Sequence, residues 1–342
     1  MATIKEIAEL AGVSTTTVSN VIHGKTKKVS PATIQKIDTL IKELGYVQKM
    51  GLRVLANESS QLIGVIINSH KEFKDSILGD PFYGRILGFI EQYVQTLGYY
   101  VMFYSAKEID QIFQMVIGWN IDGVIAISFS RKNCEKIYQL IKKPMVSIDA
   151  YGELEEEESR QVLNIGLDDV SGGYMMTKYL LECGYQHIKV CAGRDGGVDH
   201  LRFLGAQKAA DEWGNKSQKL QFVPLGMNWT KRKENYGWLM KRKQPETVLF
   251  FVSDLYALEA ISFFSSHGLS IPKDIGIAGY DDISFAQISA PRLTTVRQDV
   301  EKKAQMAVEM LMKQIHGQEI GREMDRKLPV TLMVRESTRI QR

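Results

Sequence analysis

Four polar side chains recur at helical spacing near the start of the chain, and their types suit hydrogen-bonding chemistry. They are Thr16, Ser19, Asn20 and His23. Residues three and four apart lie side by side on a helix, so these four would share one face. The opposite face carries Val18, Val21 and Ile22 and is apolar. A helix with an apolar underside and a polar edge fits the major groove of DNA, whose base pairs present distinct donor and acceptor patterns.

Two further short helices are predicted around this one. Thr3 begins a capping-box pattern, and Gly12 can supply the turn into the polar helix because glycine tolerates positive φ. Ser14 can cap that helix, and Ser30, which precedes a proline, predicts the start of a third helix. An ordinary helical hairpin is the alternative. The Ser, Thr and Asn on the outward face, in place of Lys and Glu, favour a DNA-reading unit.

Positive charge is concentrated in this N-terminal segment. Residues 1–56 contain eight Lys or Arg against four Asp or Glu, whereas the whole chain contains 43 against 40. The remaining residues are therefore close to neutral. Neutralising DNA phosphates requires such a concentration of charge. A solvated basic surface would also account for it, so the charge supports the prediction without deciding it.

Composition excludes several other classes of protein. The 342 residues are 44% hydrophobic and 24% charged, which is typical of a globular chain of two or three domains. Three cysteines without a CxxC spacing argue for a reducing compartment and against a disulfide framework or zinc site. The six histidines are scattered, and we find no signal-peptide pattern or membrane span. We expect a cytoplasmic protein with no metal or other cofactor.

From residue 62 onward, strand-like and helix-like segments alternate. The strand-like segments are Leu62–Asn68, Tyr99–Ser105, Gly123–Ser128, Met145–Ala150, Val162–Leu167, Ile188–Ala192, Leu220–Leu225, Thr247–Ser253, Ile275–Gly279 and Leu293–Val296. The helical segments include Phe82–Leu97, Gly172–Gly184, Leu201–Gly214, Leu255–Gly268 and Val300–Gly317. This alternation predicts parallel sheets with helices on both faces. About ten strands are too many for one compact sheet, so we expect two α/β subdomains that face a cleft.

The segment from Thr3 to Tyr46 resembles the DNA-binding head of the lac repressor family of bacterial transcription regulators, and the resemblance extends over essentially the whole chain. It implies a three-helix helix-turn-helix domain in residues 1–47, a hinge in 48–60 and an effector-binding and dimerisation domain in 61–342. The fold class is then α plus α/β, with two doubly wound parallel-sheet subdomains of periplasmic-binding-protein type. Their implied extents are about 61–160 plus 292–323, and about 161–291 plus 324–342.

The resemblance also assigns DNA contacts. Base contacts would come from Thr15, Thr16, Asn20 and Leu55, of which the leucine would be a hinge wedge that partly unstacks a minor-groove step. Phosphate contacts would come from Thr3, Ser14, Thr17, Ser19, His23 and Tyr46. His23 departs from the asparagine that is usual in the family, which puts its phosphate contact in question.

Six residues are implied to contact an effector, namely Phe82, Tyr83, Arg202, Trp229, Ser253 and Asp281. Asp281 follows Gly279-Tyr280, a pattern that resembles the effector motif of the family, and its carboxylate can accept from two vicinal hydroxyls. The Arg202 guanidinium can donate to two oxygens at once. Trp229 would stack on a sugar ring, with a place in the core as an equal alternative. The implied effector is a sugar or phosphosugar.

These features predict a ligand-responsive transcription regulator, and specifically a repressor that binds a near-palindromic operator DNA as a homodimer. A tetramer stays open, as does whether the ligand releases or promotes DNA binding. One alternative is a regulator controlled by a docking partner protein. The other is a sugar-binding protein or α/β enzyme with a vestigial head. No nucleophile–base arrangement, P-loop or GxGxxG after a strand is evident, so we expect no enzymatic activity.

Overall fold

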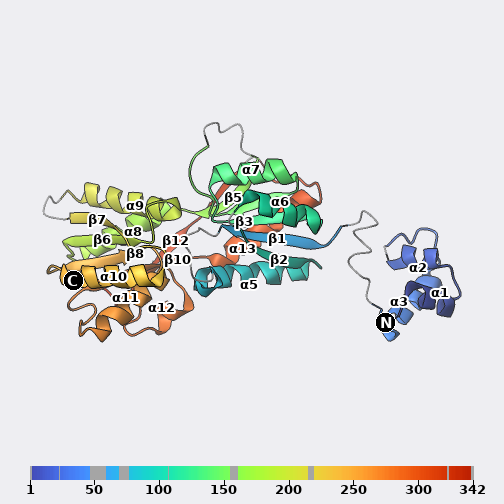
Figure 1. Ribbon diagram of the computed structural model, residues 1–342, viewed down its shortest axis with the longest axis horizontal. Helices are drawn as coiled ribbons and strands as arrows, with labels where there is room; N and C mark the ends of the chain where they lie inside the picture. The colour runs from blue at the N-terminus through green and yellow to red at the C-terminus, as the bar shows by residue number, and fades with distance from the viewer. Residues whose placement is uncertain are drawn as a thin grey trace. The chain divides into compact units, whose positions relative to one another are not determined.

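A computed structural model of the protein describes residues 2–22, 24–46, 59–68, 77–106, 108–154, 161–214, 219–321 and 323–339. The chain separates into a head, Met1–Ser60, and a body, Gln61–Arg342, each with its own internal contacts (Figure 1). Among the residues in these ranges, no helix is long and apolar enough to cross a lipid bilayer.

The head is built from three helices around one small core. The helices are α1 (Ile4–Ala11), α2 (Thr15–Ile22) and α3 (Pro31–Glu43). The core residues are Ile7, Ala8, Ala11, Val18, Val21 and Ile37. The apolar positions predicted on the three helices therefore meet in one cluster, as a helix-turn-helix unit requires.

Local hydrogen bonds fix where the head helices begin and end. The Thr3 hydroxyl accepts from the amide of Glu6, and the Glu6 carboxylate accepts from the amide of Thr3, so α1 starts with a complete capping box. Gly12 ends α1 with a φ of 72°, which glycine adopts without a Cβ clash. Ser14 Oγ accepts from the Thr17 amide at 3.1 Å and caps α2.

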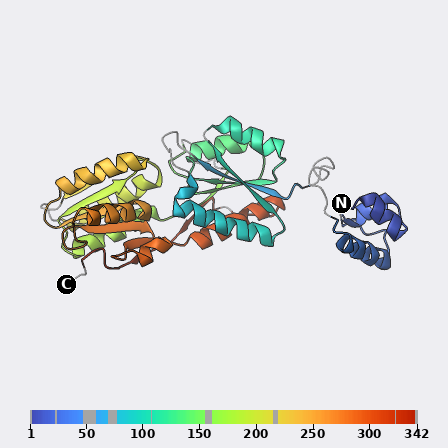
Figure 2. The same cartoon turned by 60° about the horizontal axis from the view of Figure 1, so that its bottom comes forward.

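The body contains two six-stranded sheets, each between two layers of helices (Figures 1 and 2). The N-subdomain sheet has the parallel order β11-β5-β4-β3-β1-β2. Its strands are β1 (Leu62–Asn68), β2 (Tyr100–Ala106), β3 (Gly123–Ile127), β4 (Met145–Ile148), β5 (Leu163–Leu167) and β11 (Asp325–Leu328). One face packs on α5 (Pro81–Thr96), after the short η1 (Ile77–Gly79), and on α13 (Val300–Ile315). The other packs on α6 (Ile109–Gly118) and α7 (Arg131–Ile141).

The C-subdomain sheet has the order β12-β10-β9-β8-β6-β7 and is parallel except for β12, which runs antiparallel to β10. Its strands are β6 (His187–Ala192), β7 (Lys219–Pro224), β8 (Thr247–Phe251), β9 (Gly276–Asp281), β10 (Thr294–Gln298) and β12 (Val330–Met333). Helices α8 (Asp169–Glu182) and α9 (Gly197–Trp213) cover one face. Helices α10 (Trp229–Lys241) and α11 (Asp254–Ser266) cover the other, and the short α12 (Ser284–Ile288) follows β9.

The predicted fold class is confirmed, because both sheets are mostly parallel and covered on both faces. Such strands are buried on both sides and are mostly apolar, and every residue of β3, β5, β8 and β9 is buried. The ten predicted strands are present with small shifts at their ends. The prediction missed β11 and β12, because each has only four residues and is mostly half-exposed or exposed.

The chain passes between the two sheets at three places in the described body, after β5, after β10 and after β11. The expected subdomain boundaries near residues 160, 292 and 323 each fall several residues too early. Residues 163–167 and 325–328 pair in the N-subdomain sheet, and residues 294–298 pair in the C-subdomain sheet. Periodicity identifies a strand but does not say which sheet the strand joins.

Candidate functional site

The polar edge of α2 faces solvent in the head. Thr15 and Thr16 are exposed, and Ser19 and Asn20 are partly exposed, above the buried valines of the same helix. The helix therefore presents hydroxyl and carboxamide groups on an accessible face, which matches the arrangement predicted from spacing. The assignment of particular residues to bases stays a prediction. His23 and Leu55, which were also predicted to contact DNA, lie outside the described residues.

The predicted phosphate-binding hydroxyls of the head also stabilise its helices. Ser14 Oγ lies 2.9 Å from Thr17 Oγ1, and the Thr3 hydroxyl lies 3.2 Å from a carboxylate oxygen of Glu6. Tyr46 is partly exposed, and burial raises the pKa of its phenol, so the group is a neutral donor. Thr3, Ser14 and Thr17 lie at helix starts, where exposed backbone amides also favour anions, whereas Tyr46 follows the end of α3.

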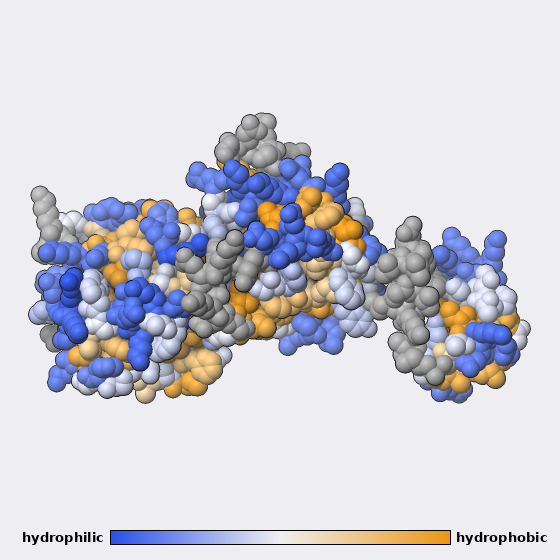
Figure 3. Space-filling model, viewed as in Figure 1, coloured by the Kyte–Doolittle hydropathy of each residue, from blue (hydrophilic) through white to orange (hydrophobic). Residues whose placement is uncertain are grey.

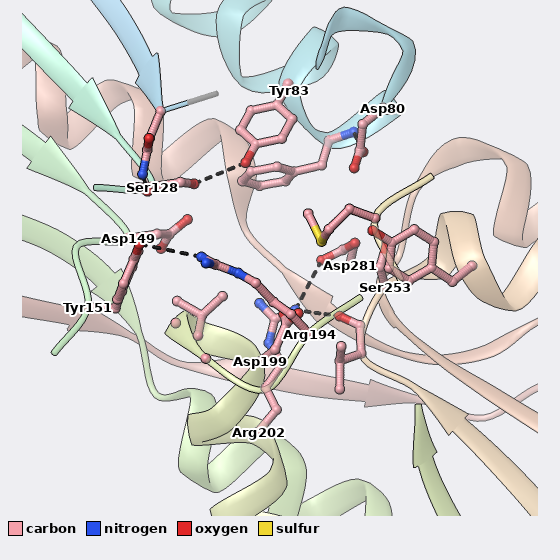
Figure 4. Close-up of a pocket in the computed structure, with 18 of the residues that line it drawn as sticks. Asp80, Tyr83, Ser128, Asp149, Tyr151, Arg194, Asp199, Arg202, Ser253 and Asp281 are labelled. Carbon is pink, nitrogen blue, oxygen red and sulfur yellow. Dashed lines mark hydrogen bonds and ion pairs between the residues drawn. The ribbon is translucent and has the colours of Figure 1, made fainter. Parts of the chain in front are cut away.

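In the body, a cavity of about 150 Å³ lies where the carboxyl ends of strands from both sheets meet (Figure 4). Its lining follows β1, β3 and β4 of the N-subdomain and β6, β8, β9 and β10 of the C-subdomain. Ligands of open parallel sheets bind at this end of the strands. Five predicted effector residues line the cavity, namely Phe82, Tyr83, Arg202, Ser253 and Asp281. We call it the cleft pocket.

Trp229, the sixth predicted effector residue, is not among the lining residues of the cleft pocket. It begins α10, its side chain is 43% exposed, and its ring centroid lies 6.3 Å from that of Tyr236. Met227, two residues earlier, lines the pocket instead. The indole therefore lies beside the site, and its stacking on a ligand stays a prediction.

An aromatic wall closes the pocket from the N-subdomain. Phe82 and Tyr83 meet edge to face with ring centroids 5.3 Å apart. Asp80 caps α5 by accepting from the Phe82 amide at 2.9 Å, and the Tyr83 hydroxyl donates to Ser128 Oγ at 3.1 Å. Burial raises the pKa of Tyr83, so its hydroxyl stays protonated. Two aromatic faces held in this way suit the apolar side of a small ligand.

Arg202 is buried and already held by protein groups. Its Nε donates to Asp169 Oδ1 at 2.8 Å, and its Nη1 donates to the carbonyl of Val252 at 2.6 Å. The guanidinium lies 3.7 Å from the Tyr280 ring centroid and 3.9 Å from Asp281 Oδ1. Burial works to lower the pKa of Arg202, but Asp169, Tyr280 and Asp281 outweigh it and raise that pKa. The group is a permanent cation in a fixed orientation.

Two glycines allow α8 and α9 to approach closely enough to place Arg202. A Cβ on Gly173 of α8 would collide with the backbone carbonyl of Arg202. A Cβ on Gly205 of α9 would collide with the carbonyl of Val170. Side chains at these two positions would push the helices apart and move the guanidinium away from the pocket.

Asp281 ends β9 in an unusual backbone conformation with a φ of 125°, and Asp282 follows with a φ of 53°. Such conformations persist only where surrounding contacts enforce them. Here Arg297 and Arg335 each form an ion pair with Asp282 at 2.6 Å. Burial raises the pKa of Asp281 well above its usual range, and the charge of Arg202 opposes that shift. The carboxyl lines the pocket, and in its protonated form it can donate a hydrogen bond as well as accept one.

A buried lysine that the sequence prediction missed links the two subdomains beneath the pocket. Lys303 of α13 is fully buried, and its Nζ donates to both carboxylate oxygens of Asp149 at 2.9 and 2.8 Å. It also donates to Gln298 Oε1 at 2.8 Å, and Gln298 Nε2 donates to Asp281 Oδ1 at 2.5 Å. The sequence signal was a single lysine within the apolar stripe of α13.

Two further acids lie near the pocket. The Asp254 carboxylate accepts from the Ile283 amide at 3.0 Å and from Thr295 Oγ1 at 2.6 Å. It thus holds the loop after β9, and burial raises its pKa to about 7. Asp199 lines the pocket from the first turn of α9 and accepts no hydrogen bond from the described residues. Burial raises the pKa of Asp199 to about 6.

The charged groups of the pocket favour a neutral ligand rich in hydrogen-bond donors. Its lining includes four acids (Asp80, Asp149, Asp199 and Asp281) and two arginines (Arg194 and Arg202). Asp149 and Arg202 already have buried ion-pair partners. Arg194 donates to the Tyr151 hydroxyl at 3.4 Å. The groups left for a ligand are mainly carboxylates, which accept from hydroxyls and amines.

Comparison with known protein families gives two matches along the chain. Residues 3–49 match the family described as bacterial regulatory proteins, lacI family, and residues 177–338 match the periplasmic binding protein-like domain. An HTH-type transcriptional repressor PurR of Actinobacillus pleuropneumoniae serotype 3 is 31% identical over 323 residues. That alignment covers 92% of this chain and 91% of the repressor.

Solved structures of similar fold cover almost the whole chain. A lac repressor dimer bound to operator and the anti-inducer ONPF matches with a TM-score of 0.82 at 23% identity, over 98% of this chain and 99% of that one. A complex of the transcriptional regulator CelR with cellobiose matches with a TM-score of 0.69 at 26% identity, over 98% and 100%. The first of these likenesses establishes the fold alone.

Proposed function

This chain belongs to the lacI family of bacterial regulatory proteins, and we propose that it binds a palindromic operator as a homodimer under the control of a small neutral carbohydrate. Its curated relatives are transcriptional repressors rather than enzymes. We propose repression in the cytoplasm, where operator DNA is found. Control by a docking partner protein is the alternative, and it predicts no ligand in the cleft pocket.

The DNA-binding half of the proposal rests on the exposed polar edge of α2 in a head rich in positive charge. One such helix reads only a few base pairs, and two heads related by twofold symmetry would read two half-sites. The hinge residues around Leu55 are proposed to add a minor-groove wedge in the specific complex. A homodimer therefore predicts an operator with the same twofold symmetry.

In vitro selection from random duplexes tests this half directly. The full-length protein should enrich a site with twofold symmetry. Fluorescence anisotropy on that site should then give a slope of log affinity against log salt of roughly −0.9 per neutralised phosphate. Enrichment of an asymmetric site would contradict the homodimer, and a flat salt dependence would contradict DNA binding by a basic head.

The carbohydrate half of the proposal rests on the cleft pocket. Aromatic faces from Phe82 and Tyr83 suit the C–H side of a sugar, and the carboxylates suit its hydroxyls. Phosphosugars fit less well, because Arg202 is committed to Asp169 and the lining holds more acids than bases. The match to a regulator solved with cellobiose supports the same class of ligand.

A thermal-shift screen of neutral sugars and phosphosugars should identify the effector, because a ligand that binds only the folded state raises its stability. Isothermal titration should then show that Asp281→Ala loses that ligand, while its affinity for DNA without ligand stays close to wild type. Asp211→Ala, at an exposed position of α9, is the matched control. Equal affinity in wild type and Asp281→Ala would place the effector elsewhere.

The buried Lys303 contacts suggest how the pocket would influence the rest of the chain. Lys303 holds Asp149 at the end of β4, while Gln298 joins it to Asp281 at the end of β9. A ligand that hydrogen-bonds to the Asp281 carboxyl would therefore change the contacts between the two subdomains. Such a two-state rearrangement is the coupling between sites that regulation by a ligand requires.

A further inference from the structure

A second cavity, of about 240 Å³, lies at the amino ends of the C-subdomain strands, at the opposite end of that sheet from the cleft pocket. Seven residues line it: His187, Lys189, Lys219, Gln221, Trp238, Arg242 and Gln244. We call it the basic pocket. The surface at the left end of the body in Figure 3, around α10, is largely hydrophilic.

The floor of the basic pocket is one face of two paired strands. His187 of β6 lies opposite Lys219 of β7, and Lys189 lies opposite Gln221. Alternate residues of β6 are only half-buried at this end, so these side chains share the same face. Lys189 and Lys219 occupy diagonal positions on this face, so the floor of the basic pocket carries two lysines.

The wall of the basic pocket holds two cations against one indole. Lys189 Nζ lies 5.4 Å from the ring centroid of Trp238, and the guanidinium carbon of Arg242 lies 4.8 Å from it. Both contacts are within the range of cation–π attraction. Burial lowers the pKa of Lys189, and the neighbouring charge of Arg242 lowers it further. The two cations are therefore close enough to repel each other.

Among the residues that the structure describes, no acidic side chain lines this pocket, and none of its basic side chains forms an ion pair. Cations elsewhere in the same subdomain are compensated, as Arg232 is by Glu259 and Arg335 by Asp282. Arg242 gains some stabilisation from its place at the C-terminus of α10. That explanation does not extend to Lys189 or Lys219, which lie on strands.

We propose that the basic pocket binds the phosphate group of a small phosphorylated metabolite. Arginine forks and lysine ammonium groups are the usual partners of phosphate oxygens. Gln221 and Gln244 add neutral donors, and the exposed part of the Trp238 ring can cover an apolar portion of the same ligand. Binding there would relieve the repulsion between the cations, and it would not compete with a neutral ligand in the cleft pocket.

Tryptophan fluorescence of the full-length protein tests the proposal at constant ionic strength, which is kept with potassium chloride because exposed charges are screened by salt. Inorganic phosphate and glucose 6-phosphate are the probes, and glucose is the uncharged control. Both phosphates should give a saturable change, with glucose 6-phosphate binding more tightly. Trp238→Phe should abolish the fluorescence change and retain binding in a thermal-shift assay.

Variants can distinguish phosphate binding in the basic pocket from binding in the cleft pocket and from a loss of folding. The double variant Lys189→Met with Arg242→Gln should weaken phosphate binding at least about tenfold, since two charge-assisted contacts are lost. Lys178→Met, at an exposed position of α8, removes one positive charge away from the basic pocket and should bind phosphate as wild type does. Asp281→Ala should also keep phosphate binding, even if it loses the cleft ligand.

Three results would overturn the proposal. Undiminished phosphate binding by a folded double variant would show that these cations are not the site. Loss of phosphate binding in Asp281→Ala would show that phosphate binds in the cleft pocket and not in the basic pocket. Equal affinity for inorganic phosphate and glucose 6-phosphate would show that the pocket recognises phosphate alone and not a phosphorylated metabolite.

Discussion

The head and the cleft pocket use their polar side chains in opposite ways. The polar edge of α2 comes from one short helix, faces solvent and leaves the packing of the head to other residues. The cleft pocket draws side chains from segments more than 200 residues apart, such as Asp80 and Asp281, and two of its charged groups, Asp149 and Arg202, are already held in buried ion pairs. The polar edge of α2 is an exposed surface, whereas the charged groups of the cleft pocket also hold the two subdomains together.

In the head, the residues proposed to bind DNA are different from those that stabilise the fold. In the cleft pocket, the same charged residues serve both purposes. A substitution on the polar edge of α2 would remove a proposed contact to DNA without disturbing the core. A substitution among the pocket charges would remove a proposed contact to a ligand and leave another buried charge without its partner, which is costly. Substitutions in the two regions should therefore differ in whether they change folding, binding or both.

The largest effect is expected from Lys303→Met. Methionine fills a similar volume but leaves the Asp149 carboxylate buried beside Gln298 without its cation. Breaking a buried ion pair from one side costs about 3–5 kcal/mol. Urea unfolding followed by tryptophan fluorescence should show the loss, because all four tryptophans lie in the body, at Trp119, Trp213, Trp229 and Trp238.

The adjacent Lys302→Met is the control for Lys303→Met. Lys302 is exposed and bonds only Gln305 through its side chain, so its substitution should change stability by no more than about 0.5 kcal/mol. If the two variants unfold alike, the pocket charges do not support the fold, and the contrast with the head disappears.

Asn20→Ala, in contrast to Lys303→Met, should weaken DNA binding and leave stability unchanged. Loss of a base contact should weaken binding to the selected operator by roughly 1–3 kcal/mol and change binding to random DNA much less. Thermal unfolding should stay as in wild type, because the Asn20 side chain lies outside the head core. Gln35→Ala, at an exposed position of α3, is the control. Equal losses on operator and random DNA would make Asn20 a phosphate contact instead.

The head could be predicted almost completely from sequence because its signals are local. A capping box, a turn glycine and apolar residues three and four apart are all visible within about twenty residues, and the structure contains each of them. The body was predictable only in part. Its strands were found by their apolar runs, but their membership of one sheet or the other depends on pairing between distant segments, and three subdomain boundaries were displaced.

The pocket was predictable only where a motif marked it. Asp281 and Arg202 were found through resemblance, whereas Lys303, Asp149 and Gln298 carry no local signature of their long-range contacts. Asp254 likewise carries no local signature of its contacts, because its carboxylate accepts from the distant Ile283 amide and occupies the space that Gly279, which has no side chain, leaves beside β9. Burial of charge is a tertiary property, and spacing does not reveal it.

A smaller effect is expected in the pH dependence of stability. The folded pKa of Asp199 is raised from 3.8 to about 6 by burial. Between these values the folded carboxyl keeps a proton that the unfolded one has released, so stability falls as pH rises from about 4 to about 6. Asp199→Asn should flatten part of that slope in thermal unfolding. Asp211→Asn should keep the wild-type slope, and an unchanged slope in Asp199→Asn would mean that Asp199 is already compensated.

The smallest effect is expected from Trp229→Ala, which tests where the pocket ends. The indole is 43% exposed, packs against Tyr236 and lies outside the lining, so the truncation should change the affinity for the sugar found in the screen less than about twofold. Tyr83→Phe is the comparison, since it removes only the hydroxyl that bonds Ser128 and should weaken binding more. A tenfold loss of sugar affinity in Trp229→Ala, measured by isothermal titration, would instead show that the indole stacks on the sugar ring in the complex. The cleft pocket would then include a solvent-exposed side chain that contacts the ligand, as the polar edge of α2 is proposed to contact DNA. The difference in exposure between the two sites would be smaller.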